Sequence, residues 1–268
     1  MNPHTNPIGV FDSGIGGLSI LKALRAEMPQ ESFVYYADSA HNPYGSKGDA
    51  FVIDRSRAIT QQLINDHHIK ALVVACNTAT AAAVAVLRDE HPSLPIIGVE
   101  PALKPAVAIS QTQRIAVLAT RGTLQSAKFL ALKATLQGQA EFICTACDGL
   151  ADAIEQHDGS ANHTVITTDL IANYLISTSE KCQFGQLSGQ IDTLVLGCTH
   201  YPLMLPVFRR ILGHTVHIVD NGQAVARRLA QCIVPAQPHA GPTGTLTLLS
   251  SGQASHLADA AARWLAVD

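Results

Sequence analysis

The sequence contains few aromatic residues, little charge and no cluster of one sign. Aromatic residues make up 5% of the 268 positions, charged residues make up 15%, and the formal net charge is −3. The basic pairs Arg209-Arg210 and Arg227-Arg228 stand apart from each other rather than forming a run. Nucleic-acid-binding surfaces need clustered Lys and Arg, so we expect no nucleic-acid partner.

Long apolar runs and targeting signals are also missing. The apolar stretch at residues 79–87 is much shorter than the roughly 20 residues that cross a bilayer. Residues 1–6 lack the charged and apolar regions of a signal peptide. We therefore expect no membrane association and a cytoplasmic location.

The cysteines are too sparse for a disulfide framework. Six cysteines in a chain of this length, without a secretion signal, indicate reduced thiols. Cys144 and Cys147 have the C-x-x-C spacing of redox and zinc sites, but neither a second pair nor a nearby His pair accompanies them. We expect a buried structural pair here, and no metal site.

Strand and helix patterns alternate along the chain. Short apolar runs predict strands, and longer periodic segments between them predict helices. Repeated strand–helix units indicate a parallel sheet with helices on both faces, so the predicted class is α/β. The predicted strands cover residues 8–11, 32–37, 71–75, 96–99, 114–119, 140–144, 193–197, 216–219 and 245–249. The predicted helices cover residues 18–26, 49–67, 80–90, 124–136, 165–179, 203–212, 223–231 and 254–265.

The pattern of the first half starts over in the second. Residues 8–14 align with residues 115–121 at an offset of 107 (115 − 8), and residues 69–76 align with 191–198 at an offset of 122 (198 − 76). Two similar offsets in the same order indicate duplication. We therefore predict two similar doubly wound parallel-sheet domains related by pseudo-symmetry, with the active site in the cleft between them.

The predicted domain boundary rests on a proline and on the strands and helices that follow the second half. Pro101 interrupts the regular pattern after a predicted strand, which marks a linker. Additional strands and helices follow the second half, and we assign them to the first sheet. The predicted domains are residues 1–98 with 213–268, and residues 99–212.

Cys76 and Cys198 each end the same sequence motif, I-x-x-L-V-apolar-small-Cys. Each copy of the motif predicts a buried parallel strand. Both thiols therefore fall at carboxyl ends of strands, the edge at which open α/β sheets bind ligands. A helical pattern follows each cysteine, and the positive end of a helix favours the thiolate form. Both thiols are candidate bases, although a strand-end cysteine can equally be inert.

Two loops at the same predicted edge carry polar residues. Residues 12–17 follow the first strand and could hold an anion with backbone N–H groups, but their spacing is not that of a nucleotide-binding fingerprint. Asp12 could instead meet an ammonium group, orient a thiol or cap the next helix. The loop at residues 38–47 follows the second strand and is a predicted wall of the cleft.

Four segments resemble the glutamate racemases, cofactor-independent enzymes that supply D-glutamate for peptidoglycan. The segments are Gly9–Ser19, Asn42–Gly45, Ala75–Ala79 and Gly197–Pro202, and the resemblance extends from Pro7 to the final helix. It implies a small amino-acid substrate, no cofactor and no metal. A homodimer is common in the family.

The resemblance also implies a two-base mechanism and a set of roles. Cys76 would take the proton from D-glutamate and Cys198 from L-glutamate, on opposite faces of the α-carbon. Asp12 would assist Cys76, and His200 would assist Cys198. The positions that match the family's substrate contacts are Asp12, Ser13, Tyr44, Gly45, Asn77, Thr78, Thr120, Thr199 and His200.

The sequence departs from the family pattern at two places. Glu155 matches an acidic partner of the histidine, but residues 148–152 differ from the apolar, proline-containing run usual there. His41 stands where an arginine is common. The departure at 148–152 leaves the match at Glu155 open, and no role is assigned to His41.

Three alternatives remain at this stage. A racemase of the same superfamily acting on aspartate or a hydantoin would differ in pocket length, which a sequence shows poorly. A two-domain protein that closes on an amino acid without reacting would give the mirrored thiols no purpose. A thiol–disulfide oxidoreductase would use Cys144 and Cys147 instead.

Overall fold

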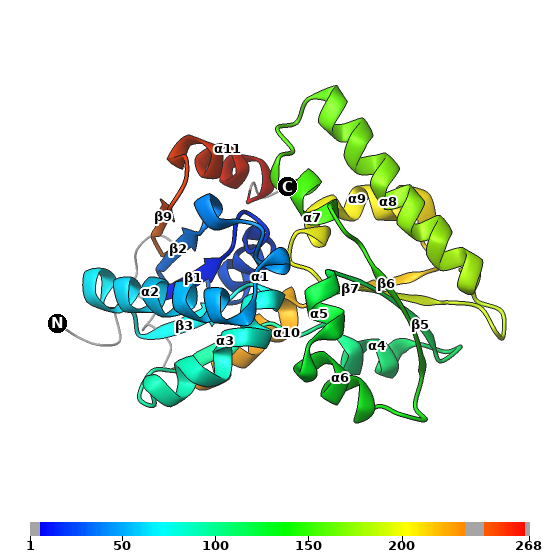
Figure 1. Ribbon diagram of the computed structural model, residues 1–268, viewed down its shortest axis with the longest axis horizontal. Helices are drawn as coiled ribbons and strands as arrows, with labels where there is room; N and C mark the ends of the chain where they lie inside the picture. Colours follow the sequence, from blue (N-terminus) through cyan, green and yellow to red (C-terminus); the bar gives the residue numbers. More distant parts are fainter. Residues whose placement is uncertain (1–5, 234–243, 266–268) are drawn as a thin grey trace. The chain divides into compact units, whose positions relative to one another are not determined.

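The computed structural model describes residues 6–233 and 244–265, and the chain forms two compact units. Unit 1 comprises residues 1–99 and 222–268, and unit 2 comprises residues 100–221. Each unit is an α/β structure around one parallel sheet (Figure 1). Residues 1–5, which carry most of the signal-peptide argument, lie outside the described part. Within that part, every helix is too short or too polar to span a membrane.

Unit 1 has a five-stranded sheet in which all neighbouring strands are parallel. Its central strand β1 and its neighbours β2 and β3 are buried along their whole length, which explains their continuous apolar sequence. In sheet order, the strands are β4 (Ile96–Gly98), β3 (Ala71–Val74), β1 (Ile8–Asp12), β2 (Phe33–Ala37) and β9 (Leu246–Ser250).

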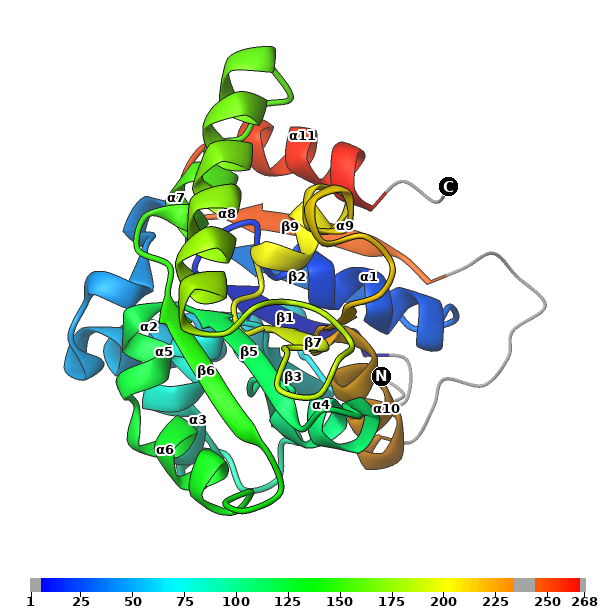
Figure 2. The same cartoon turned by 90° about the vertical axis from the view of Figure 1, so that its right-hand side faces the viewer.

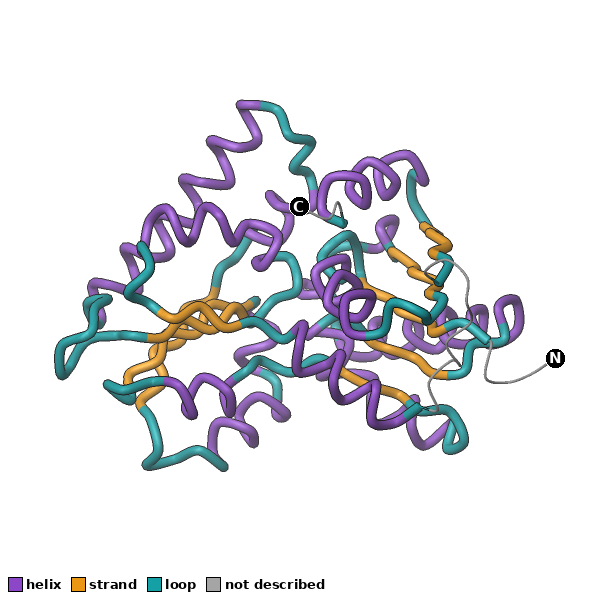
Figure 3. Tube along the Cα trace, turned by 180° about the vertical axis from the view of Figure 1, so that it is seen from behind, coloured by secondary structure: helices purple, strands orange, loops and turns teal. Residues whose placement is uncertain are grey.

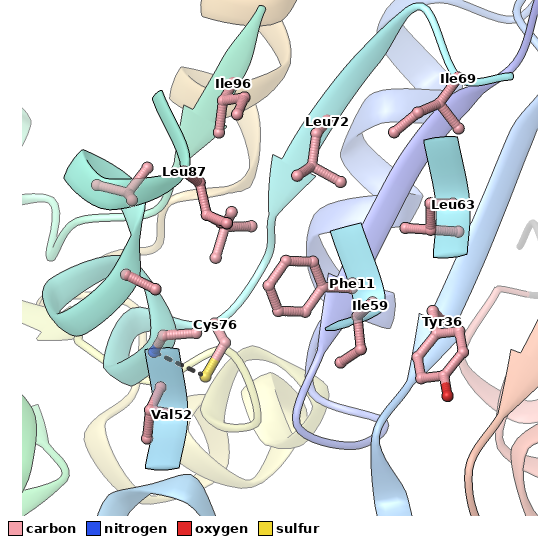
Figure 4. Packing of buried hydrophobic residues seen from close by; sticks show 14 of the residues in the cluster. Phe11, Tyr36, Val52, Ile59, Leu63, Ile69, Leu72, Cys76, Leu87 and Ile96 are labelled. Carbon is pink, nitrogen blue, oxygen red and sulfur yellow. Dashed lines mark hydrogen bonds between the residues drawn. The ribbon is translucent and has the colours of Figure 1, made fainter. Parts of the chain in front are cut away.

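Helices cover both faces of this sheet (Figure 3). Figure 4 shows Phe11 and Leu72 of the sheet packed against Ile59 of α2 and Leu87 of α3. Helices α1 and α10 pack together on the other side. The helices are α1 (Leu18–Glu27), α2 (Asp49–His67), α3 (Asn77–Glu90), α10 (Gly222–Cys232) and α11 (Ala254–Trp264), with short 3₁₀ turns η2 (Ser39–His41) and η3 (Tyr44–Ser46).

Unit 2 has a four-stranded parallel sheet. Helices α4 and α6 cover one face of this sheet and form an apolar cluster with it. Helix α8 packs against β6 on the other face (Figure 2), where Thr145 and Thr178 are hydrogen-bonded at 2.8 Å. In sheet order, the strands are β6 (Glu141–Ala146), β5 (Arg114–Ala119), β7 (Thr193–Leu196) and β8 (His217–Val219). The helices are α4 (Leu103–Ile109), α5 (Arg121–Gln125), α6 (Ala127–Ala134), α7 (Leu150–Glu155), α8 (Ala161–Lys181), the 3₁₀ turn η4 (Tyr201–Met204) and α9 (Leu205–Leu212).

The assignment of the strand at 216–219 to the first domain is wrong. Strand β8 pairs with β7, so that Leu194 lies opposite Ile218, and unit 2 runs to residue 221 instead of 212. A short connection after α9 favours pairing with the preceding strand. The predicted helix at 124–136 is also interrupted, because Ser126 caps a new helix by accepting a hydrogen bond from the Phe129 N–H.

The predicted duplication is confirmed by topology and register. The strand order β2-β1-β3-β4 in unit 1 repeats as β6-β5-β7-β8 in unit 2, and β9 is an addition to unit 1. The Ala75 N–H donates to the Phe11 carbonyl at 2.7 Å, and the Gly197 N–H donates to the Leu118 carbonyl at 2.7 Å. These bonds are related by the sequence offsets of 107 (118 − 11) and 122 (197 − 75). The residue that follows each donor is a cysteine.

Candidate functional site

Cys76 lies between the end of β3 and the start of α3. Its sulfur caps the helix by accepting a hydrogen bond from the Ala79 N–H at 3.5 Å (Figure 4). The thiol also donates to Ser13 Oγ at 3.8 Å, and the residue is 6% exposed. Cys76 is the N-cap residue of the full-length helix α3, so its sulfur lies at the positive end of the helix dipole, as the sequence predicted.

Asp12 is fully buried at the end of β1, the strand that pairs with β3, which Cys76 follows. Its Oδ1 accepts hydrogen bonds from the Ser13 N–H at 2.6 Å and from Ser13 Oγ at 3.2 Å. Ser13 therefore links the carboxylate to the sulfur. Helix α1 begins after Gly17 without a side-chain cap, so the alternative that Asp12 caps this helix is wrong.

The glycines after Asp12 allow a close approach between backbone and side chains. A Cβ atom at Gly17 would lie 2.8 Å from the Asp12 Cβ and 2.8 Å from the Tyr35 hydroxyl. That hydroxyl donates to the Gly14 carbonyl at 2.6 Å. The loop thus shapes the surroundings of Asp12, which accounts for its small residues.

Asn77 follows Cys76 and offers an unsatisfied acceptor. Its Nδ2 donates to the Val99 carbonyl at 3.3 Å, whereas its buried Oδ1 has no partner among the described residues. A buried polar atom of this kind calls for an explanation, and a ligand donor is one. Thr78 stands next to it, half-buried in the first turn of α3.

Tyr44 and Gly45 form the turn η3, and the Tyr44 ring is buried. The Tyr44 hydroxyl donates to Asp38 Oδ2 at 2.6 Å, and Arg55 of α2 binds both oxygens of the same carboxylate. Burial, followed by the hydrogen bond to Asp38, raises the pKa of Tyr44 far above its usual range. Burial would raise the pKa of Asp38, but its hydrogen bonds, led by that from Arg55, leave it lowered.

Cys198 occupies the matching position after β7 in unit 2. It is 7% exposed, and its sulfur lies 3.8 Å from His200 Nδ1. The predicted α-helix after this cysteine is first a 3₁₀ turn, and α9 begins only at Leu205. The polar group beside the Cys198 sulfur is therefore the imidazole of His200 rather than the N-terminus of an α-helix.

His200 connects the thiol to Glu155 of α7. Its Nε2 lies 2.8 Å from Glu155 Oε2, and both side chains are buried. Burial would lower the pKa of His200, but the hydrogen bonds with Cys198 and Glu155 raise it well above its usual value. The unusual sequence at 148–152 leaves Glu155 beside the histidine. It also places Asp152 nearby, where burial raises the pKa of that carboxyl group.

Two threonines complete the edge of the second sheet. Thr120 follows β5 and caps α5, since its Oγ1 accepts from the Thr123 N–H at 3.3 Å. Thr199 follows Cys198 and is buried. Strands β5 and β7 are neighbours, so both residues stand at the same edge as the thiol.

The expectation of a buried Cys144–Cys147 pair holds for Cys147 only, because Cys144 is half-buried. Cys147 donates to the Thr145 carbonyl at 3.6 Å, and Cys144 donates to the Phe142 carbonyl at 3.9 Å. Burial, with a further contribution from nearby Cys198, raises the pKa of Cys147 to about 12, so it stays a thiol at neutral pH. The described residues contain no group of three or more His, Cys, Asp or Glu side chains that could hold a metal ion.

The duplication relates the positions of the two thiols, but not those of the titratable side chains beside them. At the offset of 107 (119 − 12) the position of Asp12 is occupied in unit 2 by Ala119, and at the offset of 122 (200 − 78) the position of His200 is occupied in unit 1 by Thr78. The predicted residues divide between the units: Asp12, Ser13, Tyr44, Gly45, Cys76, Asn77 and Thr78 lie in unit 1, and Thr120, Cys198, Thr199 and His200 lie in unit 2. Each unit thus carries one thiol with its own acid–base group.

Known proteins resemble this chain over most of its length. Residues 18–229 match the family model described as Asp/Glu/hydantoin racemase. A glutamate racemase of Cupriavidus pinatubonensis is 45% identical, over 100% of this chain and 94% of that protein. The crystal structure of a glutamate racemase isoform from Bacillus anthracis has a TM-score of 0.82 at 30% identity, covering 98% of this chain and 94% of that one. The Escherichia coli glutamate racemase, crystallised with L-glutamate and the activator UDP-MurNAc-Ala, has a TM-score of 0.79 at 27% identity, covering 97% and 95%.

Proposed function

Because the chain belongs to the Asp/Glu/hydantoin racemase family, we propose that it is a glutamate racemase that interconverts L- and D-glutamate by two-base proton transfer. The observation that carries the mechanism is the repeated position of a buried thiol, after β3 in one unit and after β7 in the other. A duplicated fold that keeps a thiol at each copy of one site suits chemistry at two faces of one carbon. In this proposal the reaction supplies D-glutamate for peptidoglycan, and the enzyme acts in the cytoplasm.

Cys76 is the base for D-glutamate in this proposal. Its thiolate, favoured by the start of α3, removes the α-proton, and the same group as a thiol returns a proton when L-glutamate is the substrate. Asp12 assists through Ser13, which contacts both the sulfur and the carboxylate. This arrangement supports a role for Asp12 in setting the protonation state of the Cys76 sulfur.

Cys198 is the base for L-glutamate. His200 holds a positive charge beside the sulfur because Glu155 stabilises the imidazolium from the other side. An imidazolium next to a thiol favours loss of the thiol proton, which prepares Cys198 to act as a base. Glu155 therefore acts through His200 rather than on the substrate.

The remaining residues bind the substrate and stabilise the negative charge that develops at the α-carbon. An amino-acid α-proton is very weakly acidic, so preorganised donors in a dry site must stabilise the carbanion. In the proposal, the unpartnered Oδ1 of Asn77 accepts from the substrate ammonium. Donors in the loops and first helical turns that follow the strands bind the carboxylates, and they belong to Ser13, Tyr44, Gly45, Thr78, Thr120, Thr199 and His200.

The scheme makes the enzyme alternate between two protonation states. A turnover from L to D leaves a proton on Cys198 and removes one from Cys76, so each form accepts one enantiomer until the protons are redistributed. The mechanism requires both sulfurs to reach the α-carbon along one line, from opposite sides.

The direct test is turnover of glutamate by the purified protein with no pyridoxal phosphate added and with a chelator present. Circular dichroism should show L-glutamate losing optical activity until both enantiomers are equally abundant, and D-glutamate doing the same. L-Aspartate and a substituted hydantoin serve as competing substrates. Preferential turnover of either would replace glutamate by that alternative, and glutamate binding without turnover would support the non-catalytic binding protein.

A further inference from the structure

Asp38 and Arg55 form an ion pair that the two-base scheme does not use. Asp38 is fully buried at the end of β2, and its carboxylate has contacts at both oxygens. Oδ2 accepts from the Tyr44 hydroxyl at 2.6 Å and from Arg55 Nε at 2.9 Å. Oδ1 accepts from Arg55 Nη2 at 2.8 Å and lies 3.0 Å from His41 Nδ1. With both oxygens engaged in this way, Asp38 is unsuited to act as a base.

The pair connects separate elements of unit 1 at the ligand-binding edge of the sheet. Asp38 follows β2, Arg55 belongs to α2, and Tyr44 belongs to the turn η3. The Asp38 N–H donates to the carbonyl of Asp12 at 2.9 Å. The ion pair is therefore anchored to the strand end that carries Asp12, the proposed partner of Cys76. Buried ion pairs are weak contributors to net stability compared with apolar packing, which favours a role in fixing geometry.

Ser251, the residue after β9, contacts the backbone on both sides of Asp38. The Ser251 N–H donates to the Ala37 carbonyl at 3.0 Å, and Ser251 Oγ accepts from the Ala40 N–H at 3.1 Å. The Ser251 hydroxyl also helps to lower the pKa of Asp38. A segment more than 200 residues away in sequence therefore helps to hold the group that binds Tyr44.

We infer that Asp38 and Arg55 are positioning residues that act through the Tyr44 hydroxyl to fix the Asn42–Gly45 turn, and thereby the affinity for glutamate. The inference rests on the proposed function, in which this turn binds a substrate carboxylate. The phenol of Tyr44 is engaged by Asp38, so Tyr44 contributes the location of its turn and not a transferable proton.

Three variants and one control test this role. Arg55→Lys keeps the positive charge but loses the two-pronged geometry, Tyr44→Phe removes only the hydroxyl, and the third variant combines both. Arg57→Lys is the matched control, because Arg57 lies two residues further along the same helix. Its guanidinium makes a similar contact through two nitrogens with Glu90 on the exposed surface. Each protein is measured for kcat and KM in both directions, for the pH profile of kcat and for thermal unfolding.

Both single variants should raise KM by about tenfold or more, the cost of losing a hydrogen bond to a charged group, while kcat stays within about threefold. The pH profile of kcat should not move. The double variant should match the more affected single variant, because both changes break one connection. Arg57→Lys should leave KM and kcat unchanged.

Several results would overturn the inference. Unchanged KM with a lowered melting temperature would make the pair merely structural. A raised KM for Tyr44→Phe with an unchanged KM for Arg55→Lys would mean that the hydroxyl binds substrate directly. A fall in kcat with a displaced pH profile would give the pair a chemical role.

Hydrogen exchange separates this inference from the proposed function. The amides of residues 42–47 should exchange faster in Arg55→Lys and Tyr44→Phe than in the wild type, while those of α3 stay unchanged. Unaltered exchange in this turn would refute the positioning role even in an active enzyme. A wild type inactive on glutamate would refute the proposed function, whereas the exchange result would still decide whether the pair fixes the turn.

Discussion

His200 Nε2 and Glu155 Oε2 lie 2.8 Å apart in a buried contact, and the opposite nitrogen of the same imidazole faces the Cys198 sulfur. The histidine thus lies between two groups that favour its charged form. This arrangement overcomes the effect of burial and raises the pKa of His200.

The raised pKa predicts a specific dependence of stability on pH. A folded-state pKa above the unfolded value near 6.5 means that the stabilisation is complete below that pH and is lost as the pH rises through the folded-state pKa. The free energy of unfolding of the wild type, measured by urea denaturation, should therefore fall relative to that of His200→Asn as the pH increases above 6.5. In Glu155→Gln the folded-state pKa should be less raised, so the fall should end at lower pH and be smaller. An identical profile for all three proteins would contradict the assigned contacts.

Each thiol should be essential for racemisation but not for folding. Cys76→Ala and Cys198→Ala should each reduce kcat by at least about 10²–10⁴-fold, the usual contribution of a positioned acid or base. Both cysteines are small and lie at strand ends, so the circular dichroism spectrum and the cooperative unfolding transition should persist. Substantial turnover by either variant would remove that thiol from the mechanism.

Gly17→Ala should disturb the Asp12 side by steric contact alone. Gly17 has φ −63° and ψ −11°, which alanine adopts easily, but the new Cβ would lie 2.8 Å from Asp12 Cβ and the Tyr35 hydroxyl. Such overpacking typically costs about 1–3 kcal/mol of unfolding free energy, and we expect kcat to fall as well because Asp12 must move.

Gly48→Ala is the control for this substitution. A Cβ at Gly48 meets no atom within 4 Å, and the change should cost at most about 1 kcal/mol, the effect of a poorer helix cap. Equal losses for the two variants in denaturant unfolding would show that the crowding at Gly17 is unimportant.

Cys147 should be unreactive and dispensable for proton transfer. Its pKa of about 12 keeps it protonated at pH 7, and it is 1% exposed. Brief treatment of the native protein with iodoacetamide, followed by mass spectrometry of its peptides, should leave Cys147 unmodified. Cys147→Ser should retain turnover within about tenfold, since only packing is altered. Rapid alkylation of Cys147, or disulfide exchange activity that requires it, would favour the oxidoreductase alternative.

The sequence was sufficient to predict the two halves of the fold and the places of both thiols. Cys76 and Cys198 each end the same apolar strand motif, at an offset of 122 (198 − 76), and this signal is local and repeated. The pairing of β8 could not be obtained in the same way, because a three-residue strand such as His217–Val219 carries no information about which sheet it joins. The break at Ser126 was missed because a single capping hydrogen bond interrupts an otherwise continuous helical pattern.

Residues that act through tertiary contacts were also missed. Arg55 is one of several charged residues on α2, and nothing in its neighbourhood distinguishes it from Arg57, which pairs with a surface carboxylate. Its role depends on which face of α2 lies over Asp38. Glu155 was found only through the family resemblance, because its partner His200 is 45 residues away.

Solvent isotope incorporation tests the two-base mechanism most directly. L-Glutamate is incubated with the enzyme in D₂O, and both enantiomers are separated at low conversion and analysed by mass spectrometry. Since one sulfur removes the α-proton and the other delivers a solvent-derived proton, D-glutamate should carry deuterium from the first turnovers while the remaining L-glutamate stays unlabelled. D-Glutamate that retained its original α-hydrogen would contradict proton transfer by two separate thiols.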